Sequence, residues 1–357
     1  MSAARSEDRP VRDEDAFDVG AVDGWLRELG VRGLGDGGEP PEVRQFAGGA
    51  SNLTYLLRYP RRDLILRRPP AGTKAASAHD MAREHRIQAG LRPVFPTVPE
   101  MVGLCTDHAV LGGDFYVMER VEGVIPRAQM PPQIGTDPQL MARIGERFVD
   151  LLAELHAVDP AAAGLAELSR GDGYVRRQVA GWSERYRRAK TWNVPSFGRV
   201  MRWLDEQQPD DVGACVIHND FRLDNLVLDA DDPLRVRAVL DWELTTLGDP
   251  LADLGLLLVY WSNPGGQDGG AFPSANSIEG FPEASVLVER YAAQTGRDLS
   301  QIDYYVAFGF WKLACIAHGI AARARTGSLG GDRAGVDEMD RQVASLARHA
   351  EQALTRV

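Results

Sequence analysis

Three polar side chains are spaced in a way that suits the transfer of a phosphoryl group. Asp220 and Asn225 lie five positions apart on a predicted loop that leaves a short apolar strand, and Asp241 ends a second apolar strand 21 positions after Asp220. Phosphoryl transfer through a loose transition state needs little covalent help from a protein, but it needs positioning and charge neutralisation. The spacing therefore favours this kind of chemistry.

Each of these residues has an expected role. A carboxylate beside a nucleophilic hydroxyl can orient it and take its proton, so Asp220 is expected to be the catalytic base. Mg²⁺ prefers a few oxygen ligands and keeps waters and phosphate oxygens for the rest of its octahedron. The carboxylate of Asp241 and the amide oxygen of Asn225 are therefore expected to hold the metal. Arg222, two positions beyond the base, is expected to offset charge on the transferring group.

Taken singly, these residues carry little information, because a surface Asp or Asn is most often solvated or part of a turn. The ordered combination of His218, Asp220, Asn225 and Asp241 on strand, loop and strand is far more specific. His218 itself is expected to be a structural hydrogen-bonding residue rather than an acid or base.

The elements that must position these residues fall into two regions. Residues 43–68 hold β-branched and aromatic runs that predict strands of an antiparallel sheet, notably 53–59 and 64–67. Later in the chain the composition favours helices, with apolar residues at helical spacing in 141–156. The other predicted elements are helices at 22–29, 78–91, 174–190, 197–207, 284–294, 303–326 and 337–356, and strands at 115–118, 226–228 and 236–240.

The charge and composition of the chain indicate which partners and which cellular compartment to expect. The 357 residues carry a formal net charge of -11, which argues against nucleic acid because its binders concentrate positive charge. Cys105, Cys215 and Cys315 lie far apart in sequence, form no C-x-x-C motif and are odd in number, as expected of reduced thiols in a cytosol. With no signal-like N-terminus and no membrane-length apolar run near the centre, a cytoplasmic protein without a membrane partner is expected. The oligomeric state is unknown from the sequence.

The same segments resemble the aminoglycoside phosphotransferase and choline kinase-like superfamily over roughly residues 40–325. His218-Asn219-Asp220 stands where that superfamily has H-G-D-x-x-x-x-N, and residues 240–243 are similar to its I-D-W-E signature. Residues 248–254 resemble its G-D-P-x-x-D-L segment, in which Asp253 is expected to brace the catalytic loop. Within the superfamily, the chain is most similar to bacterial phosphotransferases related to the kinase-like domain fused to some eukaryotic acyl-CoA dehydrogenases.

The resemblance implies an α+β, two-lobed protein-kinase-like fold, with a small antiparallel-sheet N-lobe and a larger, mainly helical C-lobe. We expect a disordered tail at residues 1–18, a nucleotide-binding lobe at 19–120, and a catalytic and substrate-binding lobe at 121–357. Asn219 replaces the usual Gly, a change that is expected to be tolerated because Asn also accepts unusual backbone angles.

The resemblance also implies an ATP site. A hairpin covers the nucleotide, an arginine replaces the usual strand lysine and pairs with a helix glutamate, and backbone groups of the interlobe link meet the adenine. That arginine is Arg67, or Arg68 if the strand register is off by one. The hairpin glycines, the ion pair and the link each also have an ordinary structural interpretation. The implied nucleotide-binding residues are Gly48, Gly49, Ser51, Asn52, Arg67, Glu84, Glu119 and Val121.

These observations predict an ATP- and Mg²⁺-dependent kinase that moves the γ-phosphate to a hydroxyl of a small molecule. The acceptor class stays open among hydroxyacyl compounds, sugars, amino alcohols and aminoglycosides. The alternative is a catalytically silent nucleotide-binding regulatory module, which would not need Asp220, Asn225 and Asp241 together. A protein kinase is less expected, because no A-P-E segment stands between Asp241 and Asp253.

Overall fold

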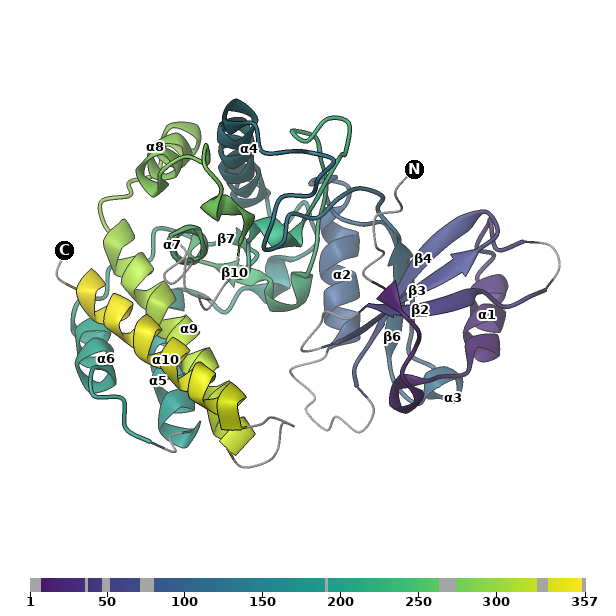
Figure 1. The fold of residues 1–357 in the computed structure, drawn as a ribbon, viewed down its shortest axis with the longest axis horizontal. Coiled ribbons are helices and arrows are strands. Elements are labelled where there is room, and N and C mark those ends of the chain that lie inside the picture. The colour runs from purple at the N-terminus through teal and green to yellow at the C-terminus, as the bar shows by residue number, and fades with distance from the viewer. Residues whose placement is uncertain are drawn as a thin grey trace. The chain divides into compact units, whose positions relative to one another are not determined.

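The computed structural model describes residues 8–35, 38–46, 52–70, 80–189, 192–262, 274–325 and 333–354. The chain divides into two compact units (Figure 1). The first unit comprises Met1–Glu122 and Arg237–Glu243, and the second comprises Gly123–Val236 and Leu244–Val357. The lobe boundary, expected after residue 120, thus falls after Glu122, and a later segment of the chain belongs to the first unit.

The first unit is built on a six-stranded sheet in the order β1-β2-β3-β4-β6-β5. Every neighbouring pair is antiparallel, which confirms the predicted sheet. The strands are β1 (Asp8–Arg9), β2 (Glu42–Phe46), β3 (Leu53–Tyr59), β4 (Arg62–Arg68), β5 (Met101–Cys105) and β6 (Phe115–Glu119), and the helices are α1 (Val19–Glu28), α2 (Met81–Leu91) and α3 (His108–Leu111).

Alternation along the central strands gives this sheet two apolar faces. Leu64 and Leu66 of β4 pack in the cluster that contains Leu26 of α1. Ile65 lies in the opposite cluster with Met81 of α2. Successive strand side chains point to opposite faces, and Figure 1 shows α1 and α2 on opposite sides of the sheet. The consecutive residues 67 and 68 must therefore point to different faces.

The prediction of a disordered tail through residue 18 is wrong for residues 8–18. Asp8 and Arg9 pair with β2, and Asp13–Asp15 forms a short 3-10 helix. Asp15 is buried, and its carboxylate accepts a hydrogen bond of 2.7 Å from Gln45 Nε2. The polar composition that suggested disorder supplies these bonds instead. Residues 1–7 lie outside the described residues.

The second unit is mainly helical, and the helices predicted within it are confirmed to within a few residues at each end. Its helices are α4 (Pro138–His156), α5 (Tyr174–Ala189), α6 (Phe197–Glu206), α7 (Pro250–Trp261), α8 (Ala284–Thr295), α9 (Ile302–Arg325) and α10 (Arg333–Ala353). Its strands β7 (Cys215–Ile217), β8 (Leu226–Leu228) and β10 (Thr246–Gly248) are short, and β9 (Val236–Val239) ends in the first unit.

Helix α7 was not predicted. The Asp249 side chain caps its N-terminus by accepting from Leu251 N, and Pro250 occupies the first turn. Nearly all of its residues are buried, so it lacks the polar face that marks an amphipathic helix. Helix α9 is long and apolar enough to cross a membrane by length and composition, yet 72% of its apolar window is buried inside the protein, as in a core helix.

Helices α7 and α9 pack closely where each carries a glycine. A Cβ added at Gly255 would lie 2.7 Å from backbone atoms of Tyr305. A Cβ added at Gly309 would lie 2.9 Å from Cγ2 of Val259. The two glycines therefore allow α7 and α9 to pack this closely.

We predict that Gly255→Ala lowers the free energy of unfolding by about 1–3 kcal/mol, because the added methyl overpacks this crossing. Gly319→Ala, elsewhere on α9, is the matched control, since its Cβ would meet nothing within 4 Å. The control should be neutral or stabilise by up to about 1 kcal/mol through helix propensity. Urea unfolding of both variants checks this, and equal effects would contradict the close crossing.

Candidate active site

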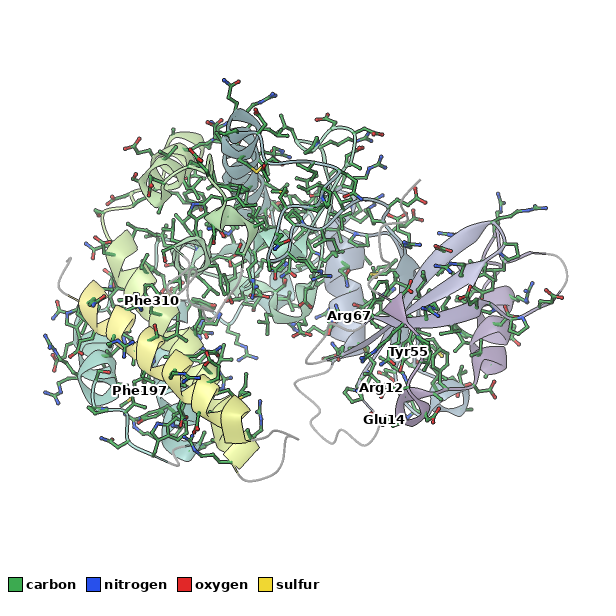
Figure 2. All side chains as sticks on the ribbon, viewed as in Figure 1. Arg12, Glu14, Tyr55, Arg67, Phe197 and Phe310 are labelled. Carbon is green, nitrogen blue, oxygen red and sulfur yellow. The ribbon has the colours of Figure 1, made fainter. Side chains whose placement is uncertain are left out.

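In the first unit, Arg67 lies among three carboxylates. It is on the side of the sheet that faces α2 (Figure 2). Its Nη1 is 3.7 Å from Glu84 Oε2, and its Nη2 is 3.3 Å from Asp241 Oδ1 and 3.5 Å from Glu243 Oε2. Burial alone would lower the pKa of Arg67, but Tyr116 and the three carboxylates outweigh it and hold the pKa above its ordinary value. The guanidinium therefore keeps its charge.

Glu84 is held by more than its ion pair. The hydroxyl of Tyr116 donates to its Oε2 at 3.0 Å, and Asn52 Nδ2 donates to its Oε1 at 3.0 Å. Asn52 Nδ2 also donates a hydrogen bond to Glu243 Oε2 at 3.2 Å. Burial raises the pKa of Glu84, an effect that Arg67 partly offsets. The predicted pairing of Arg67 with Glu84 is thus present, within a network that also contains the unpredicted Glu243.

Arg68 points to the opposite face, as the strand alternation requires. Its Nη2 donates to the backbone oxygen of Asp15 at 2.6 Å and to the hydroxyl of Tyr55 at 3.0 Å. Of the two arginines that the sequence left open, Arg67 is the one beside Glu84 and Asp241.

Asp241 occupies an unusual backbone conformation. Among the described residues other than glycine, only Asn219 and Asp241 have positive φ angles, 66° and 67°. Such angles cost energy and persist where the surrounding structure fixes them. Around Asp241, Trp242 is fully buried and donates from Nε1 to Val239 O at 2.8 Å. The strand end is therefore anchored on both sides of the carboxylate.

The remaining predicted nucleotide-binding residues have mixed outcomes. Gly48, Gly49 and Ser51 lie outside the described residues. The backbone N–H of Glu119 donates to Glu100 O at 2.9 Å, so this amide serves the sheet. Val121 follows the end of β6 and is half-buried. The adenine contacts expected of Glu119 and Val121 stay predictions.

In the second unit, the loop of residues 218–225, which is the predicted catalytic loop, starts at the end of β7 and is held from α7. Asp253 is fully buried and accepts the backbone N–H of His218 at 2.6 Å and of Asn219 at 2.8 Å. His156 Nε2 lies 3.3 Å from its Oδ2. Burial would raise the pKa of Asp253, but these hydrogen bonds and histidines lower it. The expected bracing by Asp253 is confirmed.

The loop brings Asp220 and Asn225 together. Asn225 Nδ2 donates to the backbone oxygen of Asp220 at 2.9 Å and to its Oδ2 at 3.2 Å. The other carboxylate oxygen, Oδ1, accepts from the hydroxyl of Tyr260 at 2.8 Å. His218 is buried, and its Nδ1 accepts from Asp220 N at 3.2 Å, in keeping with a structural role. Sequence reasoning missed Tyr260.

Arg222 is engaged by its neighbour. Its Nε and Nη2 donate to the two carboxylate oxygens of Asp224 at 2.8 and 2.6 Å. Its guanidinium lies 4.6 Å from the ring centroid of Tyr260. The carboxylate of Asp224 neutralises part of the positive charge of Arg222. The role predicted for Arg222, to offset charge on the transferring group, stays a prediction.

Asn219 is held by groups from three segments of the second unit. Its Oδ1 accepts from Lys312 Nζ at 3.1 Å and from the Tyr174 hydroxyl at 3.3 Å. Its Nδ2 donates to Leu244 O at 3.1 Å. The side chain that replaces the family's glycine thus ties the strained loop to α5 and α9. Burial lowers the pKa of Lys312 to about 8.

Both predicted metal ligands carry oxygen atoms, Asn225 in the second unit and Asp241 in the first. Asn225 turns its amide nitrogen toward Asp220. The role of the two residues as metal ligands stays a prediction. Both are oxygen ligands of the kind Mg²⁺ prefers. In the part of the chain that the structure describes, no group of three His, Cys, Asp or Glu side chains could hold a metal ion alone.

The chain matches the model of the phosphotransferase enzyme family over residues 42–303. Acyl-CoA dehydrogenase family member 10 of Mus musculus is 34% identical over 328 residues, which cover 89% of this chain and 30% of that protein. Acyl-CoA dehydrogenase family member 11 of Gallus gallus is 33% identical over 329 residues, which cover 89% of this chain and 41% of that protein. The chain therefore spans less than half the length of these curated relatives.

Solved structures share the fold. A Ralstonia eutropha protein assigned as an aminoglycoside phosphotransferase has a TM-score of 0.79 at 29% identity, covering 96% of this chain and 99% of that one. The aminoglycoside phosphotransferase APH(4)-Ia, in a ternary complex with AMP-PNP and hygromycin B, has a TM-score of 0.58 at 14% identity, covering 94% and 98%. At that identity the second likeness shows the fold alone.

The antiparallel sheet unit and the helical unit together form an α+β, protein-kinase-like fold of the phosphotransferase type, as expected. With a family model that matches most of its length, the chain belongs to the phosphotransferase enzyme family. The expected relation to the kinase-like region of acyl-CoA dehydrogenase proteins is also confirmed.

Lys312 gives a pH-dependent prediction. Its folded pKa, about 8, lies below the unfolded value of 10.5. Between about pH 8 and pH 10.5, the side chain of Lys312 binds more protons in the unfolded chain than in the folded one. The free energy of unfolding contributed by Lys312 therefore rises with pH over this range. Lys312→Met removes the cost of burying the charged amine. The free energy of unfolding of this variant, relative to that of wild type, should therefore be highest near pH 7.5 and fall toward about pH 10. Urea unfolding across this range tests it; a pH-independent difference between the two proteins would contradict it.

Proposed function

We propose that this protein is a small-molecule kinase that transfers the γ-phosphate of ATP to an alcohol. The observation that carries the proposal is the contact between Asp220 and Asn225 on a loop whose backbone Asp253 holds. A strained, braced loop that presents a carboxylate beside an amide is what phosphoryl transfer requires, since positioning and charge supply most of the catalysis.

In the proposed step, the acceptor hydroxyl oxygen attacks the γ-phosphorus while its proton passes to the carboxylate of Asp220. The bond between the γ-phosphorus and the β,γ-bridging oxygen breaks, and ADP leaves with that oxygen. Asn225 and Asp241 would hold Mg²⁺, which neutralises charge on the phosphates when bound. Arg67, kept charged by its carboxylate neighbours, would contact the phosphates of the same nucleotide.

The acceptor class remains to be found among hydroxyacyl compounds, sugars, amino alcohols and aminoglycosides. The likeness to an assigned aminoglycoside phosphotransferase supports the last class, and the identity to acyl-CoA dehydrogenase proteins supports an acyl compound. A coupled assay for ADP across a panel of these four classes identifies the acceptor. The cytoplasmic location and the lack of a nucleic-acid partner stay predictions.

We predict that Asp220→Asn lowers kcat with the acceptor by about 100-fold or more, while the affinity for Mg·ATP changes little, because the amide cannot take the hydroxyl proton. Asp231→Asn is the control, since it changes an exposed carboxylate between β8 and β9, and it should keep the kcat of wild type. Tight Mg·ATP binding by wild type without turnover on any alcohol would instead support the silent regulatory module.

The two consecutive arginines allow a matched test of nucleotide binding. Arg67→Met should weaken Mg·ATP binding by about tenfold or more, since it removes a cation from the proposed phosphate site. Arg68→Met should leave this Kd unchanged but lower the melting temperature, because Asp15 O and the Tyr55 hydroxyl lose their buried donor. Titration calorimetry and thermal unfolding separate the two effects. Equal Kd values for both variants would exclude Arg67 from the site.

A further inference from the structure

Tyr260 contacts the carboxylate to which we assign the proton. Its hydroxyl donates to Asp220 Oδ1 at 2.8 Å, on the side of the carboxylate that Asn225 does not hold. Burial and the nearby Asp220 raise the pKa of Tyr260 well above its ordinary value, so its hydroxyl keeps its proton and acts as a donor. Both carboxylate oxygens of Asp220, the proposed base, thus accept a hydrogen bond from another side chain.

The position of Tyr260 on its helix explains how this contact is set. Tyr260 follows Asp253 by seven positions on α7, and seven residues make about two turns of an α-helix, so the two side chains share one face. Asp253 holds the backbone of the catalytic loop, and Tyr260 holds the side chain that the loop presents. Helix α7 therefore contacts the loop at two points, through Asp253 and through Tyr260.

The ring of Tyr260 also borders a small hollow in the second unit, which has room for about one water molecule. Its walls are largely aromatic and aliphatic, and its polar groups include the guanidinium of Arg222, which stacks over the Tyr260 ring. Phe148 stacks on Trp261 with ring centroids 5.4 Å apart, so the wall beside Tyr260 is packed. The lining residues are Phe148, Arg222, Leu223, Leu257, Tyr260, Trp261, Ser274 and Asn276.

We propose that Tyr260 is a positioning residue for Asp220: its hydroxyl fixes Oδ1 while Asn225 fixes Oδ2, so the carboxylate is oriented before the alcohol arrives. A carboxylate oxygen has two lone pairs, so Oδ1 can accept from Tyr260 and from the acceptor hydroxyl together. This inference rests on the proposed kinase function.

Removal of one hydroxyl tests the proposal. Tyr260→Phe keeps the ring and its packing, and should lower kcat by about tenfold or more with little change in the KM for ATP, because a misoriented base mainly affects the chemical step. Tyr304→Phe is the matched control: it also loses a buried hydroxyl bond, to Leu204 O at 2.8 Å, on a part of α9 that does not touch Asp220. The control should keep kcat within about twofold of wild type.

Asp220→Asn, run beside these variants, separates the two claims. If Asp220→Asn keeps its kcat, the proposed function fails. If Asp220→Asn is inactive while Tyr260→Phe retains the kcat of Tyr304→Phe, the kinase stands and the role of Tyr260 is overturned. A second readout needs no acceptor: in a crystal structure of Tyr260→Phe, the Asp220 carboxylate should rotate or take two orientations. A single, unchanged orientation would also overturn the proposal.

Discussion

The buried carboxylate of Asp253 is the interaction on which the catalytic loop depends. It accepts two consecutive backbone N–H groups, at 2.6 and 2.8 Å, where the chain leaves β7. Hydrogen bonds to an ionised group are stronger than neutral ones, and a buried carboxylate must be satisfied by such donors. By fixing His218 and Asn219, this pair of bonds sets where Asp220 stands, and the contacts of Asn225 and Tyr260 then orient its carboxylate.

Backbone strain and compensating contacts occur together in both units. Asn219 and Asp241 hold left-handed backbone angles, and each is surrounded by bonds that keep it there. Lys312 and Tyr174 fasten the side chain of Asn219, whereas Trp242 and Arg67 anchor the segment of Asp241. Strain of this kind is characteristic of functional sites, where the conformation is maintained for its chemistry. Here it falls on the residue next to the proposed base and on a proposed metal ligand.

Residues close together in sequence could be predicted, and residues brought in by packing could not. The spacing of Asp220 and Asn225 could predict that they lie together, because one loop carries both. That Asp241 joins them stays a prediction. The choice between Arg67 and Arg68 stayed open, since a shift of one residue reverses the face of a strand. Tyr260 gave no signal, because it lies on a helix so fully buried that it shows no amphipathic period. The ordered residues 8–18 were missed because few of them are apolar: Val11 and Phe17 pack against the core, and polar contacts of Asp15 with Gln45 and Arg68 hold the rest.

We propose that Asp220, Asn225 and Asp241 act on a single metal-bound nucleotide. The most direct measurement is a crystal structure of the protein with Mg²⁺ and AMP-PNP. We predict oxygens of Asn225 and Asp241 at about 2.0–2.1 Å from a magnesium ion that also binds the nucleotide phosphates, with the carboxylate of Asp220 facing the γ-phosphate. A magnesium ion bound without either side chain, or a γ-phosphate remote from Asp220, would contradict it.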